Sequence, residues 1–190
     1  MSPEQLSLLE PPPLSLPHGF EYRANFVPVE AEAKLIERLA GLELREFEFH
    51  GYLGKRRVAY FGLRYDFSDM AMHEAPEMPD FLLPVRDRAA GFAGLPPAAL
   101  AHALVTEYAP GAAIGWHRDR PVFDDVIGIS LGSPCRFRFR RKRGNSWERA
   151  SLMLAPCSAY TMRGPARHEW QHSIPPVDEL RYSVTFRSKA

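Results

Sequence analysis

The sequence has 190 residues, of which 45% are hydrophobic and 25% are charged, and its formal net charge is +1. This length and composition suit one folded domain with a sizeable core. No apolar run approaches the ~20 residues that a bilayer-spanning helix needs, which excludes a protein anchored in that way.

The N-terminal residues 1–18 are rich in proline and are predicted to form a flexible arm. They contain no basic segment followed by an apolar stretch, so no signal peptide is expected. The chain has only two cysteines, Cys135 and Cys157, which is too few for a disulfide framework. A reducing, cytoplasmic location is therefore expected.

Two helices are predicted in the first half of the chain. Residues 29–42 place apolar side chains on a helical period. Residues 79–94 are predicted to form the second helix, with Pro84 near its first turn. Between them, residues 47–67 are aromatic and basic and are predicted as short strands or a hairpin-like cover, and residues 70–80 as a loop.

The character of the sequence changes at His102. From there, short apolar segments follow one another, separated by turn residues, which is typical of an all-β sandwich or barrel. One of these segments, CRFRFRRKRG (135–144), contains six cationic residues within the eight positions from Arg136 to Arg143. The second half is therefore predicted to be a compact β structure with one strongly basic strand.

A zinc-protease motif, H-E-x-x-H, occurs at residues 168–172. Zinc binding by that motif needs a helix, because both histidines must share one face. A Gly-Pro pair precedes the stretch and a Pro-Pro pair follows it, so an ordinary helix is disfavoured. A strand is predicted instead, with His168, Trp170 and His172 on one face and Glu169 on the other. This arrangement argues against a zinc protease.

A different metal site is suggested by AIGWHRDRPVF (113–123). His117 and Asp119 are two positions apart, so on a strand they share a face. With His172 as a third ligand they form a two-histidine, one-carboxylate set, which suits non-haem Fe(II) oxygenases. An H-x-D pair alone is a weak signal, since most such pairs are surface or structural residues.

The segment LRYSVTFRS (180–188) provides a second element of the same kind. On a strand, Arg181, Ser183, Thr185 and Arg187 alternate onto one face. Two arginines on one face could hold a small dicarboxylate, with one carboxylate on each guanidinium. The alternative is that both arginines are solvated on an outer strand face.

Together these segments resemble the AlkB family of Fe(II)- and 2-oxoglutarate-dependent dioxygenases. The resemblance covers about residues 45–188 and is carried by VTEYAPGAAIGWHRD, IGISLGSPCRFRF, EWQHSIPP and RYSVTFR. It implies an α+β fold with a double-stranded β-helix (jelly-roll) core, N-terminal supporting helices and a nucleotide-recognition cover. It implies one domain over residues 19–190, with the cover at about 45–75 and the catalytic β core at 102–188.

The resemblance also implies the metal site and the cofactors. His117, Asp119 and His172 match the iron ligands, and the co-substrates are 2-oxoglutarate and O₂. His168 then becomes an outer or structural residue, and the H-E-x-x-H match is accidental.

Five residues match the family's 2-oxoglutarate site. Arg181 matches the arginine that binds the distal carboxylate, and Arg187 matches the one near the keto-acid end. Tyr108 matches the tyrosine that reaches the co-substrate. Thr106 and Ser183 stand where the best-known members often carry asparagines, and both can still hydrogen bond.

The activity implied is oxidative demethylation of N-alkylated bases in DNA or RNA, with release of formaldehyde, succinate and CO₂. The expected partner is methylated single-stranded DNA or RNA, with no membrane and no obligate protein partner. Repair members tend to carry an acidic residue two positions after H-x-D, where this chain has Pro121. A tRNA-modification hydroxylase, a protein methyl-lysine demethylase and a binding module with an inactive metal site therefore stand as alternatives.

Candidate substrate contacts lie in two segments of the chain. Tyr60, Phe61 and Tyr65 could stack on a flipped base, although each could equally be a core residue. Arg138 and Arg140 could contact phosphates, and the alternative for them is a merely solvated basic face.

Overall fold

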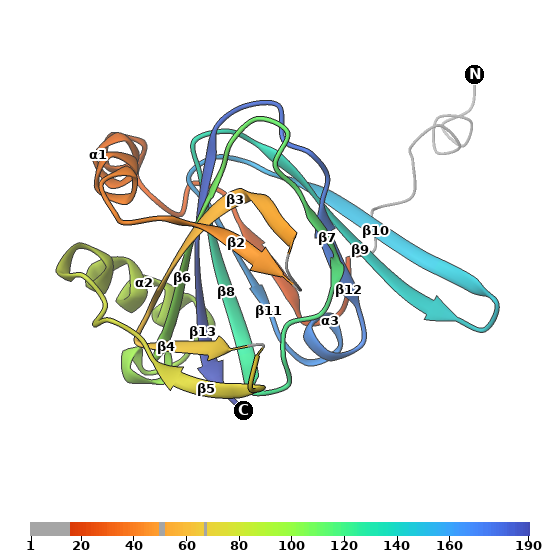
Figure 1. Ribbon diagram of the computed structural model, residues 1–190. Helices are drawn as coiled ribbons and strands as arrows, with labels where there is room; N and C mark the ends of the chain where they lie inside the picture. The colour runs from red at the N-terminus through yellow and green to blue at the C-terminus, as the bar shows by residue number, and fades with distance from the viewer. Residues whose placement is uncertain (1–15, 50–51, 67) are drawn as a thin grey trace, which may run out of the picture.

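The computed structural model describes residues 16–49, 52–66 and 68–190, and its elements form three layers (Figure 1). A seven-stranded sheet forms the middle layer, with two helices on one side and a four-stranded sheet on the other. Most of the predicted arm, residues 1–15, lies outside the described residues, as do residues 50, 51 and 67 of the predicted cover.

All strands of the described chain that pair do so in antiparallel fashion. The seven-stranded sheet has the order β1 (Phe20–Arg23), β11 (Ser158–Met162), β8 (Phe123–Leu131), β13 (Arg181–Lys189), β6 (His102–Tyr108), β3 (Tyr52–Phe61), β2 (Arg45–Phe49). The four-stranded sheet has the order β10 (Ser146–Leu154), β9 (Cys135–Arg143), β12 (Gln171–Ile174), β7 (Ile114–His117). A separate hairpin pairs β4 (Leu63–Asp66) with β5 (Ala71–Glu74).

The helices are α1 (Val29–Ala40), α2 (Leu83–Ala93) and the short α3 (Gly164–His168), with 3₁₀ turns η2 (Asp80–Leu82) and η3 (Pro97–Ala99). Helix α1 begins at Val29, as predicted, and ends at Ala40, short of the predicted residue 42. The second predicted helix, 79–94, is divided into the 3₁₀ turn η2 and the helix α2. Helix α2 has a proline in its first turn, where no intrahelical N–H bond is lost, and is followed by Gly94 in the left-handed region at φ +67°.

One hydrophobic core lies between the helices and the middle sheet. Leu35 and Leu39 of α1 are buried there, on the apolar face of an otherwise charged helix. Tyr182, Val184 and Phe186 of β13 contribute to the same core. Because strand residues alternate between faces, Arg181, Ser183, Thr185 and Arg187 must point to the opposite side, between the two sheets. Strand β13 therefore separates an apolar layer from a polar one.

A second core lies between the two sheets. Phe137 and Phe139 of β9 pack there with Tyr160 of β11 and Trp170. Tyr160 pairs directly with Gly128 of β8, and a Cβ on that glycine would lie 2.2 Å from the tyrosine ring. The missing side chain at Gly128 thus lets the Tyr160 ring lie across the sheet.

Three sequence-based expectations are corrected. Residues 70–80 are not only a loop, because they contain β5. The segment 47–67 does form strands, but β3 is an integral strand of the middle sheet, paired with β6. His168 does not share a strand with His172, because α3 ends at His168 and β12 begins at Gln171. The two histidines do not share a helix either, as the zinc-protease geometry would need.

None of the helices in the described ranges is both long enough and apolar enough to cross a bilayer. Cys135 and Cys157 are both buried and are not bonded to each other.

Candidate active site

A cavity of about 640 Å³ opens between the two sheets. Strand β13 forms one wall with the four polar residues that its alternation brings to this side, and β7 and β12 lie opposite. Its lining includes all eight residues predicted to bind the metal or the co-substrate: His117, Asp119, His172, Thr106, Tyr108, Arg181, Ser183 and Arg187. Side chains as far apart in the sequence as Thr106 and Arg187 therefore line the same cavity.

The three predicted metal ligands come together at one end of this cavity. His117 and His172 are directly opposite each other on β7 and β12, with ring centroids 4.2 Å apart. The Oδ2 atom of Asp119 lies 3.9 Å from Nε2 of His172. Strand β7 ends at His117, so Asp119 reaches the cavity from the following loop and not, as predicted, from the same strand.

The ionisation of these groups follows from their surroundings. Burial alone would raise the pKa of Asp119, but the charge of Arg187 and the two imidazoles outweigh it and hold the pKa below its usual value. Burial, together with His117, lowers the pKa of His172 to about 3, and burial also lowers the pKa of His117. At neutral pH the site therefore holds an ionised carboxylate and two neutral imidazoles, the forms that bind a metal ion.

Two further observations fit a metal ion. The Nδ1 atom of His117 lies 2.9 Å from the Gly115 carbonyl oxygen, which leaves Nε2 for another partner, as is usual for metal-binding histidines. The Oδ2 atom of Asp119 is buried and has no hydrogen-bond partner among the described residues. The three side chains are not yet arranged around a common point, however, because no three histidine, cysteine or acidic side chains of the described residues are placed to hold a metal ion together, and Oδ1 of Asp119 is bound to Arg187.

Arg181 is the strongest sign of an anionic ligand. Its side chain is 1% exposed, and its guanidinium lies over the Tyr108 ring, 4.7 Å from the centroid. Nη2 donates to the Ser130 hydroxyl at 3.2 Å, but Nε and Nη1 have no partner among the described residues. A buried charge without a counter-charge is strongly unfavourable. The donor set therefore fits a carboxylate bound at Arg181.

Arg187 is placed differently from Arg181. It binds Asp119 through Nε at 3.2 Å and Nη2 at 2.8 Å, and its Nη1 lies 3.4 Å from Nδ1 of His102. Arg187 is thus paired with a carboxylate of the chain itself, and the prediction of one guanidinium for each carboxylate of a dicarboxylate remains a prediction. Thr106 and Ser183 are register partners in the wall near Arg181 and are both buried.

The predicted base-stacking residues divide between two environments. Tyr60 and Tyr65 line the cavity, with Tyr60 edge-on to His102 and Tyr65 beneath the Arg120 guanidinium. Phe61 is buried in the core beneath the helices, so the prediction for this residue is wrong. Neighbouring residues of β3 point to opposite faces, and only one of the pair Tyr60 and Phe61 can reach the cavity.

Two further residues, Arg56 and His102, line the cavity beside the predicted site residues. Arg56 lines the cavity and lies over the Phe47 ring at 3.9 Å, whereas its neighbour Arg57 points away and forms an ion pair with Glu107 at 2.7 Å. Arg56 and Tyr60 lie on the same side of β3, because strand residues separated by an even number of positions share a face. His102 also lines the cavity, and burial together with Arg187 lowers its pKa to about 3. No local sequence signal distinguishes it.

Arg138 and Arg140 do not line the cavity. They lie on the face of β9 opposite the buried Phe137 and Phe139, in agreement with the alternation predicted from the sequence.

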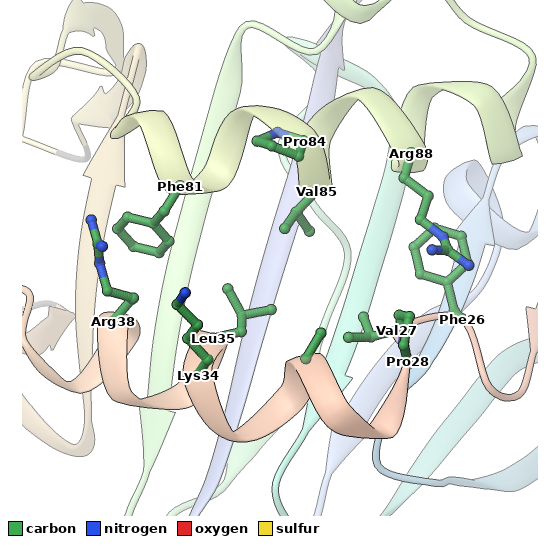
Figure 2. Close-up of a pocket in the computed structure, with 11 residues that line it drawn as sticks. Phe26, Val27, Pro28, Lys34, Leu35, Arg38, Phe81, Pro84, Val85 and Arg88 are labelled. Carbon is green, nitrogen blue, oxygen red and sulfur yellow. The ribbon is translucent and has the colours of Figure 1, made fainter.

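A second, smaller hollow of about 330 Å³ lies between α1 and α2 (Figure 2). Arg38 stacks over Phe81 and Arg88 over Phe26, each with 5.0 Å between the guanidinium carbon and the ring centroid. The described residues that line it include no acidic, histidine or cysteine side chain. The larger cavity is therefore the candidate active site.

Comparisons with known proteins agree with this geometry. Residues 19–187 match the sequence profile of the 2OG-Fe(II) oxygenase superfamily. The alkylated DNA repair protein ALKBH8 homolog of Arabidopsis thaliana is 28% identical over 201 residues, which cover 92% of this chain and 56% of that protein. The alpha-ketoglutarate-dependent dioxygenase AlkB of Escherichia coli (strain K12) is 32% identical over 124 residues, 59% of this chain and 56% of that one. The chain spans about half the length of the curated relatives it matches.

Among solved structures, OsALKBH1 superimposes with a TM-score of 0.71 at 17% identity, covering 90% of this chain and 96% of that one. This likeness confirms the predicted α+β, double-stranded β-helix fold.

Proposed function

The chain belongs to the 2OG-Fe(II) oxygenase superfamily as an AlkB-like dioxygenase, and from this premise we propose that it demethylates N-alkylated bases in single-stranded DNA or RNA. Enzymes of this superfamily use Fe(II), 2-oxoglutarate and O₂. When bound, the iron would allow O₂ to oxidise both 2-oxoglutarate, to succinate and CO₂, and an N-methyl group, to hydroxymethyl, with one oxygen atom going to each. The hydroxymethyl group so formed leaves the nitrogen as formaldehyde, and the nitrogen regains a proton.

The metal would be held by His117, His172 and Asp119. Two neutral imidazoles and one carboxylate are the donors that non-haem iron prefers, and they leave other positions open for ligands. Arg187 has a positioning role in this proposal. By binding Oδ1 of Asp119 it orients the carboxylate and keeps it ionised, while the unpartnered Oδ2 remains for the metal.

Arg181 would bind the distal carboxylate of 2-oxoglutarate. Its two unpartnered nitrogens, Nε and Nη1, can donate to both oxygens of one carboxylate, which is the strongest geometry for this pair. The Tyr108 ring beneath the guanidinium keeps water from that side. The hydroxyls of Thr106 and Ser183 would add hydrogen bonds along the same wall.

The observation that carries the choice of substrate is that Tyr60, Tyr65 and Arg56 line the same cavity as the candidate metal ligands. Two aromatic rings suit a planar base, since flipped bases are held by stacking. Arg56 has its cation over Phe47 and is not ion-paired among the described residues, so it suits a nearby phosphate. The name of the Arabidopsis thaliana relative, an alkylated DNA repair protein homolog, supports the same class of substrate.

Formaldehyde release from a substrate panel tests this proposal. The panel holds methylated single-stranded DNA and RNA, their duplexes, tRNA and a methyl-lysine peptide. We expect formaldehyde from the methylated single strands in amounts equal to succinate. Formaldehyde from the peptide alone would favour the protein methyl-lysine demethylase, and oxidation of tRNA without formaldehyde would favour the tRNA-modification hydroxylase. Pro121, at a position where repair members tend to carry an acidic residue, is the sequence feature that favours these alternatives.

The two cavity tyrosines should contribute to substrate binding. We expect Tyr60→Ala or Tyr65→Ala to weaken binding of a methylated oligonucleotide by about 1–3 kcal/mol, because each removes a stacking surface. Tyr→Phe at the same position keeps the ring and serves as the control. Phe61→Ala, by contrast, should lower the melting temperature without a selective loss of substrate affinity, because Phe61 lies in the core. Equal effects at Tyr60, Tyr65 and Phe61 would contradict the stacking role.

A further inference from the structure

The four-stranded sheet has an outer face that the active-site cavity does not explain. On β9, Phe137 and Phe139 are buried between the two sheets, so the residues that alternate with them point outward. In Figure 1 the β9–β10 hairpin extends away from the body of the fold. We call the side of β9, β10, β12 and β7 opposite to Phe137 and Phe139 the outer face.

The strand register identifies the members of the outer face, because directly opposed residues of antiparallel strands lie on the same side. Arg138 is opposite Ser151 and Ser173, and Arg140 is opposite Arg149 and Gln171. Arg136 is opposite Met153, and Lys142 is opposite Trp147. Five cations thus share this face, and none of these register partners is a carboxylate. Like charges directly opposed, as at Arg140 and Arg149, destabilise a sheet unless a counter-charge is present.

Tryptophan rings alternate with these cations. The Arg140 guanidinium lies between Trp116 of β7 and Trp147 of β10, at 4.5 and 4.4 Å from their centroids. Arg138 lies 5.0 Å from the Trp116 ring. Their Nε atoms donate only to neutral oxygens, Ser173 Oγ at 3.0 Å and Gln171 Oε1 at 2.7 Å. Both guanidiniums are therefore fixed in place, and neither has a carboxylate partner among residues 16–49, 52–66 and 68–190.

On the opposite side of the same hairpin, a cation of β9 is paired with carboxylates. Arg141 points to that side and forms an ion pair with Glu148 at 2.9 Å and another with Glu169. In the part of the chain that the structure describes, Arg141 on one side of β9 is thus paired with carboxylates, whereas the cations of the outer face are not. Trp147 is 40% exposed, so part of its ring can contact a ligand. Trp116, at the other end, is also among the residues that line the cavity, so β7 borders both the outer face and the active site.

We infer that the outer face binds a single strand of nucleic acid, the same strand whose methylated base enters the cavity. Arg138 and Arg140 take phosphates, and the exposed Trp147 ring stacks on a base. Alternate residues of a strand are ~6.6 Å apart, close to the separation of successive phosphates in an extended single strand. Alternating cations and aromatic rings are the usual construction of a single-strand binding surface. The inference rests on the proposed function for its choice of partner.

The test is a titration of the full-length protein with a labelled, unmethylated single-stranded oligonucleotide, followed by fluorescence anisotropy at several salt concentrations. The double variant Arg138→Gln/Arg140→Gln should bind at least ten-fold more weakly and show a shallower salt dependence, because fewer counterions are released. Trp147→Ala should bind about five-fold or more weakly. Arg138→Lys/Arg140→Lys keeps the charge and should preserve most of the salt dependence.

Arg141→Gln is the matched control, since it removes a cation of the same hairpin that already has carboxylate partners. Its affinity should equal that of the wild type. DNA and RNA strands of one sequence should bind alike, because phosphates and base faces are common to both. Loss of affinity in Arg141→Gln equal to that in the double variant would overturn the inference, and so would unchanged binding by the double variant and Trp147→Ala. Equally tight binding of an acidic peptide or anionic vesicles would reassign the surface.

Failure of this inference is distinguishable from failure of the proposed function. Wild-type protein that releases formaldehyde from methylated single strands, while outer-face variants bind the unmethylated strand normally, would refute only the outer-face site. Oligonucleotide binding that depends on Arg138 and Arg140, without formaldehyde release from any methylated strand, would refute only the demethylation.

Discussion

Replacing His172 by alanine is expected to abolish the conversion of 2-oxoglutarate to succinate. Mutating a group that only orients a metal ligand typically lowers metal affinity or activity by about 10- to 100-fold. Loss of a ligand itself should therefore lower turnover by at least about 100-fold. His117→Ala and Asp119→Ala should have the same effect, because each leaves two protein donors. Iron(II) affinity, measured anaerobically by equilibrium dialysis, should fall in parallel with turnover in all three variants.

His168→Ala is the matched control for this experiment. His168 belongs to the same H-E-x-x-H stretch, but its side chain is 53% exposed and lies 3.4 Å from the Asp124 carboxylate. Its removal should leave iron affinity and turnover close to those of the wild type. An inactive His168→Ala beside an active His172→Ala would show that the second histidine has been wrongly assigned.

Replacing Arg181 by methionine is expected to raise the KM for 2-oxoglutarate by roughly 30-fold or more. Truncating one member of a buried, hydrogen-bonded charge pair typically costs about 2–5 kcal/mol. Arg181→Lys should raise KM by less, because the charge remains while the planar fork is lost. Arg187→Ala should impair turnover more than Arg181→Lys, since it also releases Oδ1 of Asp119.

Arg181→Met should weaken 2-oxoglutarate binding, but it should not lower the melting temperature of the protein without ligands. A buried cation without a counter-charge has a large desolvation cost, and an apolar side chain of similar volume removes that cost from the folded state. Arg181→Met should therefore melt at or above the wild-type temperature, and added 2-oxoglutarate should stabilise the wild type but not the variant. A variant that melts lower, yet is still stabilised by 2-oxoglutarate, would contradict the assignment of Arg181.

The cavity wall on β13 could be predicted from the sequence because one local rule decides it. The residues between the polar residues of this wall are apolar, and the polar residues themselves are spaced by two: Arg181, Ser183, Thr185 and Arg187. Because side chains of a strand alternate between faces, the polar set faces one side and the apolar set the other. The same rule could not choose between Tyr60 and Phe61. Both faces of β3 are covered by other layers of the fold, so an aromatic residue suits either face. Only the order of the strands in the sheet decides which of the two side chains points into the cavity.

Other features depend on contacts between distant segments and have no local signal. The pairing of Arg187 with Asp119 needs a loop after β7 to reach β13 across the space between the sheets. The ion pairs of Arg141 depend on the register of the β9–β10 hairpin and on the end of α3. The basic run at 135–144 could therefore be recognised from composition, but its separation into a neutralised and an uncompensated side could not.

The position of β13 between two chemically different layers has a consequence for how this chain can vary. A deletion or insertion of one residue within β13 would turn every later side chain to the other side of the sheet. If that change in length lay just before Arg181, both arginines would point into the core of leucines and alanines beneath the helices. Tyr182, Val184 and Phe186 would then point toward the candidate iron site. Single substitutions along β13 alter one contact at a time, whereas a change in its length destroys the core and the chemistry together. The spacing between Arg181 and Arg187 is thus as much a part of the active site as the two side chains themselves.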